Sequence, residues 1–413
     1  MNGIPIAVLH FTNSVVRGGA EEHILTLLRN LDRKIFRPLL VCPPECAEKL
    51  RPDLPGDVPL ERLQYQWPYQ VRNALHLAGI LRDYRVGILH SHLFASSLAA
   101  SPIGWLSRVP VILETPHLRE AWRHGLIKGS YVIDRAVGTC VDHYVAVSDA
   151  NARYLIEEKK LPAKKVHVIR NGCDLRKFDP ERQAPRGLKM SLGFSEDDPV
   201  VVVLARLEPQ KGHRFLLQAH ARVLREVPAV RLVCVGAGAL DQELQGQCHQ
   251  LQIQDSVRFV GYQSNVADWL ALADITVLPS LFEGLPLVAI ESLAAQRCVV
   301  ATAVDGTTEV VINERTGLTV PPGSVQELAE AIVRLLRQAE LRHRLARAGR
   351  RWVLDHFSDE QQIRKTEELY LRAWDMSSHQ MKRNRLAGAA KRFVRDRDHV
   401  TRAEQSVGAQ ESR

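Results

Sequence analysis

The chain has 413 residues, 45% of them hydrophobic and 25% charged, with a formal net charge of +8. These fractions are ordinary for a globular protein, and the length allows two domains. No stretch approaches the apolar length of a membrane-spanning helix, which argues against an integral membrane protein.

In the first half of the chain, apolar segments of strand length alternate with helical patterns. This layout is typical of a doubly wound parallel sheet. The expected strands are residues 4–11, 37–42, 86–91, 111–115, 144–148 and 166–170. The polar, proline-containing stretch from Asp174 to Pro199 has no clear period, and we interpret it as the interdomain linker.

A second alternation begins at Val200 and predicts another α/β domain. Its expected strands are residues 200–207, 231–235, 257–260, 275–278, 299–303 and 318–320. Residues 324–375 are predicted to form successive helices.

Seven cysteines are scattered through the chain without a C-x-x-C pair. Their odd number and their spacing favour reduced thiols over a disulfide framework or a zinc site. The first ten residues lead straight into an expected strand and lack the layout of a signal peptide. We therefore expect a cytoplasmic protein.

Two glutamates, Glu283 and Glu291, lie on either side of an expected helix start at Pro286. The segment 274–280 before them is typical of a buried parallel strand, and ligands bind beyond the carboxyl ends of such strands. Eight helical residues span about 12 Å, which suits a ligand of two hydroxyl-rich rings joined by phosphates. The alternative is an accidental spacing of a loop residue and a solvated helix residue.

Arg206 and Lys211 bracket the turn that follows the strand expected at 200–207. A guanidinium and an ammonium that converge at a strand end can bind a diphosphate and stabilise the charge on a departing phosphate. The alternative is an ordinary surface arginine and lysine.

Two loops contain paired glycines. Gly18 and Gly19 precede a helical run and allow a close backbone approach at a helix N-terminus. This loop does not match G-x-G-x-x-G, so it is weak support for dinucleotide binding. Gly236 and Gly238 follow another strand, where either a ligand or a plain tight turn would explain them.

Histidines lie at two strand ends. His117 follows the strand at 111–115, and His90 and His92 flank another strand end. A lone histidine is often structural, but this position favours a site. No metal-ligand spacing, nucleophile elbow or P-loop is present. We therefore expect no metal site and no cofactor.

In combination, these segments resemble the retaining GT-B glycosyltransferases of family four, also called glycosyl transferases group 1. Their order and spacing match over roughly residues 4–375. The matching segments are Gly18-Gly19, His117, Asn171-Gly172-Cys173-Asp174, Ala205-Arg206-Leu207 through Lys211-Gly212, Val235-Gly236-Ala237-Gly238, Phe259-Val260-Gly261-Tyr262 and Glu283-x7-Glu291.

The resemblance implies two Rossmann-like domains with parallel sheets that face each other across a cleft. We expect an acceptor-side domain at 1–185 and a nucleotide-sugar-binding domain at 186–357. A helix at 358–376 would return to the first domain, anchored by Tyr370 and Trp374, and a basic tail would follow at 377–413.

The resemblance also assigns roles to residues. Arg206 and Lys211 would contact the donor diphosphate, with the Gly19 N–H group opposite, while Glu283 would hold sugar hydroxyls, Glu291 the ribose, and His117 the reacting centre. The expected catalytic residues are His117, Arg206, Lys211 and Glu283. The expected donor-binding residues are Gly18, Gly19, Asn171, Arg206, Lys211, Gly236, Gly238, Val260, Tyr262, Glu283, Gly284, Leu287, Val288 and Glu291.

The implied activity is transfer of a hexosyl-type sugar, with retention, from a nucleotide diphosphate sugar to an acceptor hydroxyl. A sugar or lipid-linked acceptor in envelope polysaccharide or glycolipid synthesis is expected. The alternatives are a non-catalytic nucleotide-sugar-binding or scaffold protein on the same fold, a nucleotide-sugar epimerase and a phosphorylase. The presence of all four charged site residues favours catalysis.

The tail is strongly basic, with eight Lys or Arg against two Asp between Lys382 and Arg402. Apolar residues recur there at helical spacing, as in an interfacial membrane helix. We expect peripheral attachment to an anionic membrane surface on its inner face, the alternative being a solvated, disordered end. Nucleic-acid binding ranks below both, because Phe393 is the one aromatic residue in this segment.

Overall fold

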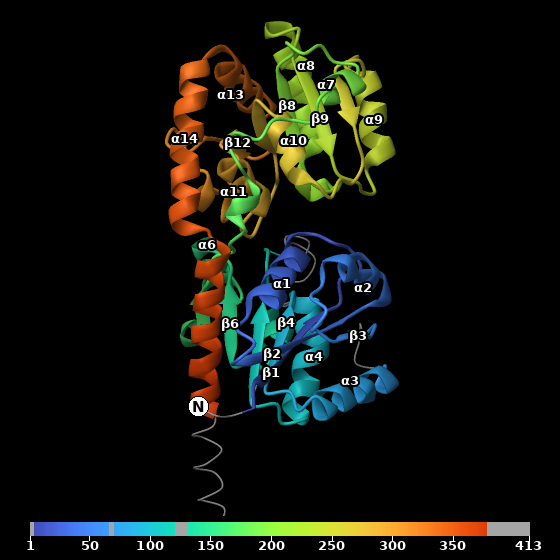
Figure 1. The fold of residues 1–413 in the computed structure, drawn as a ribbon, viewed down its shortest axis with the longest axis vertical. Coiled ribbons are helices and arrows are strands. Elements are labelled where there is room, and N and C mark those ends of the chain that lie inside the picture. The colour runs from blue at the N-terminus through green and yellow to red at the C-terminus, as the bar shows by residue number, and fades with distance from the viewer. Residues whose placement is uncertain (1–3, 66–69, 120–130, 378–413) are drawn as a thin grey trace, which may run out of the picture.

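The computed structural model describes residues 4–65, 70–119 and 131–377. Two parallel sheets, each flanked by helices, lie one above the other along the long axis of the molecule (Figure 1). This architecture confirms the predicted fold class of two α/β domains with parallel sheets.

The first sheet has seven parallel strands in the order β3-β2-β1-β4-β5-β6-β7. Six of them lie where the sequence predicted them, with ends shifted by a few residues. β3 was not predicted, because three partly exposed residues carry no readable pattern. The strands are β1 (Ile6–Thr12), β2 (Phe36–Cys42), β3 (Leu60–Arg62), β4 (Ile88–His92), β5 (Val111–Thr115), β6 (His143–Ala146) and β7 (Val166–Val168).

The second sheet has six parallel strands in the order β10-β9-β8-β11-β12-β13, and all six were predicted. Its central strand consists of four valines and a leucine, all buried, as expected for a strand covered on both faces. The strands are β8 (Val200–Leu204), β9 (Arg231–Val235), β10 (Val257–Phe259), β11 (Ile275–Leu278), β12 (Cys298–Thr302) and β13 (Leu318–Val320).

Helices connect the strands and cover both sheets (Figure 1). In the first half they are α1 (Gly19–Asn30), α2 (Pro44–Leu50), α3 (Val71–Asp83), α4 (Phe94–Leu106), α5 (Tyr131–Val137) and α6 (Asp149–Arg153). In the second half they are α7 (Leu188–Ser191), α8 (His213–Glu226), α9 (Asp241–Gln250), α10 (Val266–Leu272), α11 (Leu287–Ala294), α12 (Thr307–Val310), α13 (Val325–Arg337) and α14 (Ala339–His356).

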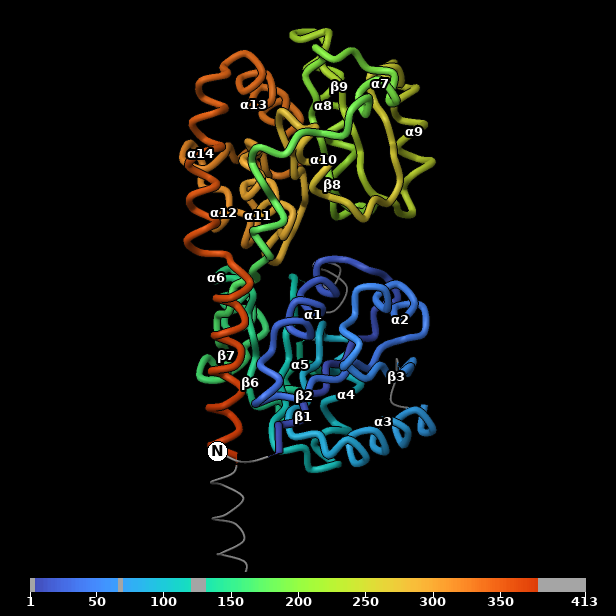
Figure 2. Tube along the Cα trace, viewed as in Figure 1, coloured from blue at the N-terminus to red at the C-terminus, as the bar shows by residue number. Residues whose placement is uncertain are grey.

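A further helix, residues 359–377, returns from the second half to the first sheet (Figure 2). The Tyr370 hydroxyl lies 2.6 Å from Nδ1 of His90, and the Ser377 hydroxyl donates a 2.7 Å hydrogen bond to the Pro110 carbonyl. The Trp374 ring packs so closely on Gly87 that a Cβ there would overlap it. These contacts hold the end of the described chain on the first sheet. The expected domain boundaries stay predictions.

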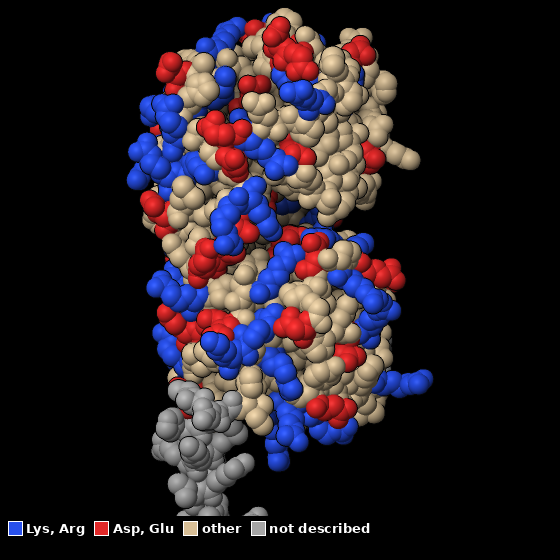
Figure 3. All heavy atoms as spheres, viewed as in Figure 1, with Lys and Arg blue, Asp and Glu red and all other residues tan. Residues whose placement is uncertain are grey.

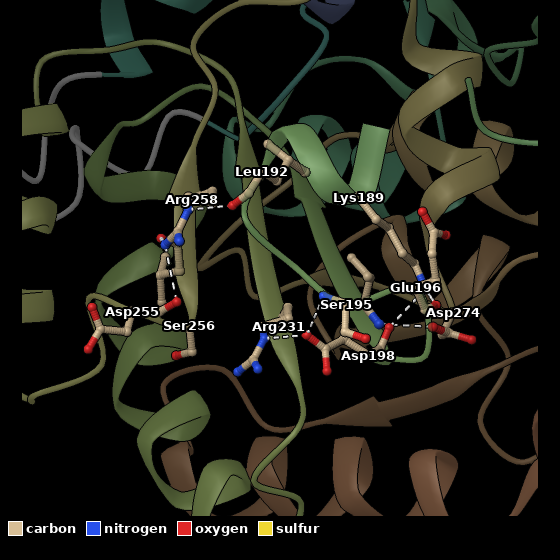
Figure 4. Close-up of polar contacts among 12 residues, drawn as sticks. Lys189, Leu192, Ser195, Glu196, Asp198, Arg231, Asp255, Ser256, Arg258 and Asp274 are labelled. Carbon is tan, nitrogen blue, oxygen red and sulfur yellow. Dashed lines mark hydrogen bonds and ion pairs between the residues drawn. The ribbon is translucent and has the colours of Figure 1, made fainter. Parts of the chain in front are cut away.

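The linker is bonded to the amino ends of the strands in the second sheet (Figure 4). Lys189 donates to the carbonyls of Glu196 and Asp198 at 2.7 and 2.9 Å. Arg231 donates to the Asp198 carboxylate at 2.8 Å, and Arg258 donates to the Leu192 carbonyl at the same distance. This network fixes the linker at the end of the sheet opposite the predicted site.

Among the described residues, no helix combines the length and the apolar character needed to cross a bilayer. All seven cysteines lie in the described part of the chain and are free. The segment 382–402, on which the membrane hypothesis depends, lies outside the described residues.

Candidate active site

The carboxyl ends of the two sheets face each other. The surface is hollowed between the two halves, and charged side chains of both signs gather along this region (Figure 3). The loops that follow β1, β5, β8 and β11 carry the predicted site residues to it. Parallel α/β sheets bind ligands at such edges.

Lys211 and Glu283 form an ion pair at this edge. Lys211 Nζ lies 2.5 Å from Glu283 Oε1, and the two side chains are 18% and 10% exposed. The Ser280 hydroxyl donates to the same carboxylate oxygen at 2.7 Å, and the backbone N–H of Glu283 donates to Asp305 at 2.9 Å. The pair was not predicted, although both residues were. It holds the carboxylate and the ammonium side by side where a sugar and a diphosphate would meet.

Arg206 follows β8 and is 35% exposed, with its guanidinium 2.5 Å from the Glu208 carboxylate. The first-loop glycines lie opposite. A Cβ built on Gly18 would be 3.8 Å from Arg206 Nε, and one on Gly19 would be 4.0 Å from Leu287. The start of α1 therefore faces both Arg206 and the start of α11.

Gly236 and Gly238 have a packing role. Gly236 has a φ of 147°, and a Cβ on either glycine would overlap a backbone carbonyl of the loop that contains Arg206. The sequence offered a ligand or a plain tight turn for these glycines, and it did not predict this close packing between two loops. Because neither glycine has a side chain, the loop that contains Arg206 can approach them closely. This approach sets the position of Arg206.

Two other predicted donor-binding residues follow β10. Val260 is half-buried and packs against the core of the second half. Tyr262 is 59% exposed, so its ring is accessible for stacking. Their roles stay predictions.

Glu291 lies on α11, about one turn from its start. Pro286 is the residue before the helix rather than its first member, and Leu287 and Val288 form the half-buried first turn. Burial and, to a smaller extent, the negative charge of Glu22 on α1 raise the pKa of Glu291 to about 7. The carboxyl therefore titrates near neutral pH.

His117 touches the second half directly. Its φ is 38°, and a Cβ on Gly284 would overlap the His117 carbonyl oxygen. The Ser148 hydroxyl donates to the Gly284 carbonyl at 3.1 Å. The two halves therefore meet backbone to backbone one residue after Glu283.

His117 belongs to a row of buried imidazoles. Its Nε2 lies 3.1 Å from Nδ1 of His92, whose Nε2 lies 3.0 Å from Nδ1 of His10. The ring of His23 meets that of His117 edge to face at 4.7 Å, and its Nδ1 lies 2.8 Å from Oδ1 of Asn171. Asn171, predicted to bind the donor, thus contacts this cluster.

The imidazoles of this cluster are neutral at physiological pH. Burial lowers the pKa of His117 and His92 well below the usual value, that of His23 to about 4 and that of His10 to about 3. His117 is therefore suited to neutral hydrogen bonding with a sugar rather than to charge stabilisation. His10 and His23 were not predicted, because one lies within a strand and the other within a helix.

Two family models match this chain. Glycosyltransferase Family 4 matches residues 17–177, and Glycosyl transferases group 1 matches residues 188–352. A glycogen synthase of Mycobacterium tuberculosis is 30% identical over 325 residues, which cover 74% of this chain and 75% of that protein. The chain belongs to glycosyltransferase family four (GT4). It is therefore a retaining glycosyltransferase that uses nucleotide-sugar donors.

Solved structures share the fold of this GT4 enzyme. Anabaena HepE in complex with UDP-glucose superposes with a TM-score of 0.77 at 20% identity, over 88% of this chain and 99% of that one. A glycosyltransferase from Rickettsia africae gives 0.73 at 22% identity, over 89% and 98%. The GT-B fold is therefore confirmed.

We predict that Gly284→Ala disturbs the contact between the two halves. The added methyl group overlaps the His117 carbonyl, so the halves must separate locally. A displacement of about 1 Å at a reacting centre costs on the order of a hundredfold in rate, and we expect this loss in kcat/KM for the donor. Transfer kinetics and small-angle scattering would measure it.

Gly246→Ala on α9 is the matched control, because nothing lies within 4 Å of a Cβ there. It should leave kinetics and scattering unchanged. Near-normal kcat/KM in Gly284→Ala would contradict the importance of this contact.

Proposed function

We propose that this GT4 enzyme transfers a hexosyl group from a UDP-sugar to a hydroxyl of a saccharide or lipid-linked acceptor in envelope polysaccharide or glycolipid synthesis. The Escherichia coli UDP-Gal:alpha-D-GlcNAc-diphosphoundecaprenol alpha-1,3-galactosyltransferase supports this choice. It is 22% identical over 307 residues, which cover 73% of this chain and 79% of that protein. HepE, solved with UDP-glucose, supports the same nucleotide.

The Lys211–Glu283 pair is the observation that supports the proposal most. A carboxylate held by an ammonium and a serine hydroxyl is positioned to accept hydrogen bonds from sugar hydroxyls. The ammonium beside it can contact the phosphate attached to that sugar. Arg206, paired with the partly exposed Glu208, can exchange that partner for the diphosphate.

In the proposed reaction, the bond between the anomeric carbon and the diphosphate oxygen breaks first. Arg206, Lys211 and the N–H groups at the start of α1 stabilise the charge left on the nucleoside diphosphate. The acceptor hydroxyl attacks from the face that the phosphate leaves, and its proton passes to a phosphate oxygen. The new glycosidic bond therefore retains the anomeric configuration.

His117 and Glu283 position the sugar in this scheme. His117 is neutral, so it can hydrogen-bond to a sugar hydroxyl without competing for the positive charge that develops at the anomeric carbon. Glu283 places a carboxylate, paired with Lys211, beside the proposed sugar position. A carboxylate there can stabilise the developing oxocarbenium ion while the ammonium contacts the diphosphate.

A panel of UDP-, GDP- and ADP-sugars tests the donor proposal. We expect UDP-sugars to raise the melting temperature most, because at equal concentration the ligand with the higher affinity stabilises the folded chain more. Proton NMR of the transfer product should show a retained anomeric configuration. A larger shift with GDP- or ADP-sugars would overturn the nucleotide assignment.

We predict that Arg206→Ala and Lys211→Ala each lower kcat by about a hundredfold, equivalent to about 3 kcal/mol, because each removes a cation that stabilises the departing diphosphate. Single-turnover transfer assays would measure the loss. Melting temperatures should change less than activity does.

Lys189→Ala provides the matched control for these two variants. It removes a lysine that is bonded to the Glu196 and Asp198 carbonyls at the opposite end of the sheet. We expect a lower melting temperature and an unchanged kcat. Near-normal turnover in either site variant would exclude the diphosphate assignment.

We also predict a pH dependence of donor binding through Glu291. Because its folded-state pKa is raised to about 7, the carboxyl becomes protonated as the pH falls through neutrality. The neutral acid accepts hydrogen bonds from ribose hydroxyls more weakly, so kcat/KM for the donor should fall on the acid side of about pH 7. Glu291→Gln should remove this limb of the profile. An identical acid limb in wild type and variant would assign the titration to another group.

A further inference from the structure

Five buried histidines gather at the carboxyl end of the first sheet. They come from separate segments: His10 from β1, His23 from α1, His90 and His92 from β4, and His117 from the loop after β5. Two triplets have ring nitrogens within 4.8 Å of one another, namely His10, His90 and His92, and His23, His92 and His117. Such a triplet can supply the three imidazole ligands of a zinc site.

The partners of the nitrogens distinguish the two triplets. Both ring nitrogens of His90 are occupied, since they lie 2.6 Å from the Tyr370 hydroxyl and 2.7 Å from the Thr115 hydroxyl. Nε2 of His23 and Nε2 of His10 are both buried without a hydrogen-bond partner among the described residues, but the triplet with His10 also requires a nitrogen of His90. A buried nitrogen without a partner is costly, and a ligand would satisfy it. The second triplet is therefore the better candidate.

We propose that His23, His92 and His117 form a binding site for a transition-metal ion, with Zn²⁺ as the ion to test. Bonds of about 2.0–2.1 Å in a tetrahedral site place two nitrogens about 3.3 Å apart. Nδ1 of His92 and Nε2 of His117 are 3.1 Å apart, close to this spacing. His23 has to approach by a small side-chain rotation. The fourth position is left for water or a substrate oxygen.

Neighbouring groups orient two of the three ligands. When Nδ1–H of His23 donates to Oδ1 of Asn171, at 2.8 Å, Nε2 carries the lone pair that a metal needs. Nε2 of His92 faces Nδ1 of His10 at 3.0 Å and can donate its proton there. Hydrogen bonds of this kind to the second ring nitrogen are typical of metal-bound histidines.

Gln362 opposes this arrangement. Its carbonyl oxygen accepts the Gly172 N–H at 2.7 Å, which turns its amide nitrogen toward Nδ1 of His23 at 2.9 Å. That N–H group favours a lone pair on Nδ1 and a proton on Nε2. A glutamate at position 362 would instead accept the Nδ1 proton and leave Nε2 ready to bind the metal.

The site has a consequence for catalysis that rests on the proposed function. A metal on His117 places a positive charge beside the proposed sugar position, where positive charge also develops at the anomeric carbon. Bound Zn²⁺ should therefore inhibit transfer rather than support it. Metal binding itself can be measured without any turnover, so the two proposals can fail separately.

Equilibrium dialysis of the full chain against Zn²⁺, with the bound metal measured by atomic emission, tests the site. We expect one ion per chain in the wild type and its loss in His23→Gln and His92→Gln. We expect Gln362→Glu to bind Zn²⁺ at least about tenfold more tightly, because the hydrogen-bond partners of metal-bound histidines change metal affinity by about 10–100-fold. Substitution with Co²⁺ should give the visible absorption of a four-coordinate site.

His143 and His167 provide the control, because their rings form a separate partly exposed pair at 3.1 Å. His143→Gln should retain the bound ion. Loss of the ion in His143→Gln, or no ion in the wild type and in Gln362→Glu, would overturn the proposal. Circular dichroism would show that each variant is folded. If Zn²⁺ binds stoichiometrically but does not inhibit transfer, the metal site is supported. The role of His117 in the proposed function would then be wrong.

Discussion

The backbone contact between Gly284 and His117 is the constraint on which the geometry of the site depends. It joins the loop after β11 to the loop after β5 and leaves no space for a side chain at position 284. Glu283 is the adjacent residue, so its position relative to His117 is set by the chain itself. The Ser148 hydroxyl, bonded to the Gly284 carbonyl, secures the same contact from the first sheet.

Charge is distributed unevenly around this contact. On the second sheet, Lys211 and Glu283 are largely buried but paired, and such a pair tolerates burial when further hydrogen bonds satisfy it. On the first sheet, the imidazoles that approach the same point are neutral. In the proposed binding mode, the donor meets charged partners on one side and neutral hydrogen-bonding groups on the other. This separation of charged and neutral groups suits a donor that consists of an anionic diphosphate and an uncharged sugar.

The sequence predicted most strands, because buried parallel strands are short runs of β-branched residues such as those of β8. It also predicted that Arg206, Lys211, Glu283 and His117 follow strand ends. It could not predict that Lys211 pairs with Glu283, because that contact depends on the order of β8 and β11 in the sheet. The packing role of Gly236 likewise depends on how closely two loops approach, which no local pattern encodes.

The histidine cluster shows the same limit most clearly. His10 lies within a strand and His23 within a helix. A single polar residue in such an element is easily interpreted as a hydrogen-bonded residue of the core rather than as part of a site. Their significance arises because β1, α1 and β4 converge, which brings the ring of His23 beside His117 and the ring of His10 beside His92. Five carboxylates could not be buried at these distances, since their charges would repel and each would lack solvation. Imidazoles can be, because each neutral ring offers one donor and one acceptor and can pass a hydrogen bond to the next. Neutrality therefore allows the row to form, and it leaves lone pairs in the interior that a proton, a sugar hydroxyl or a metal ion can use.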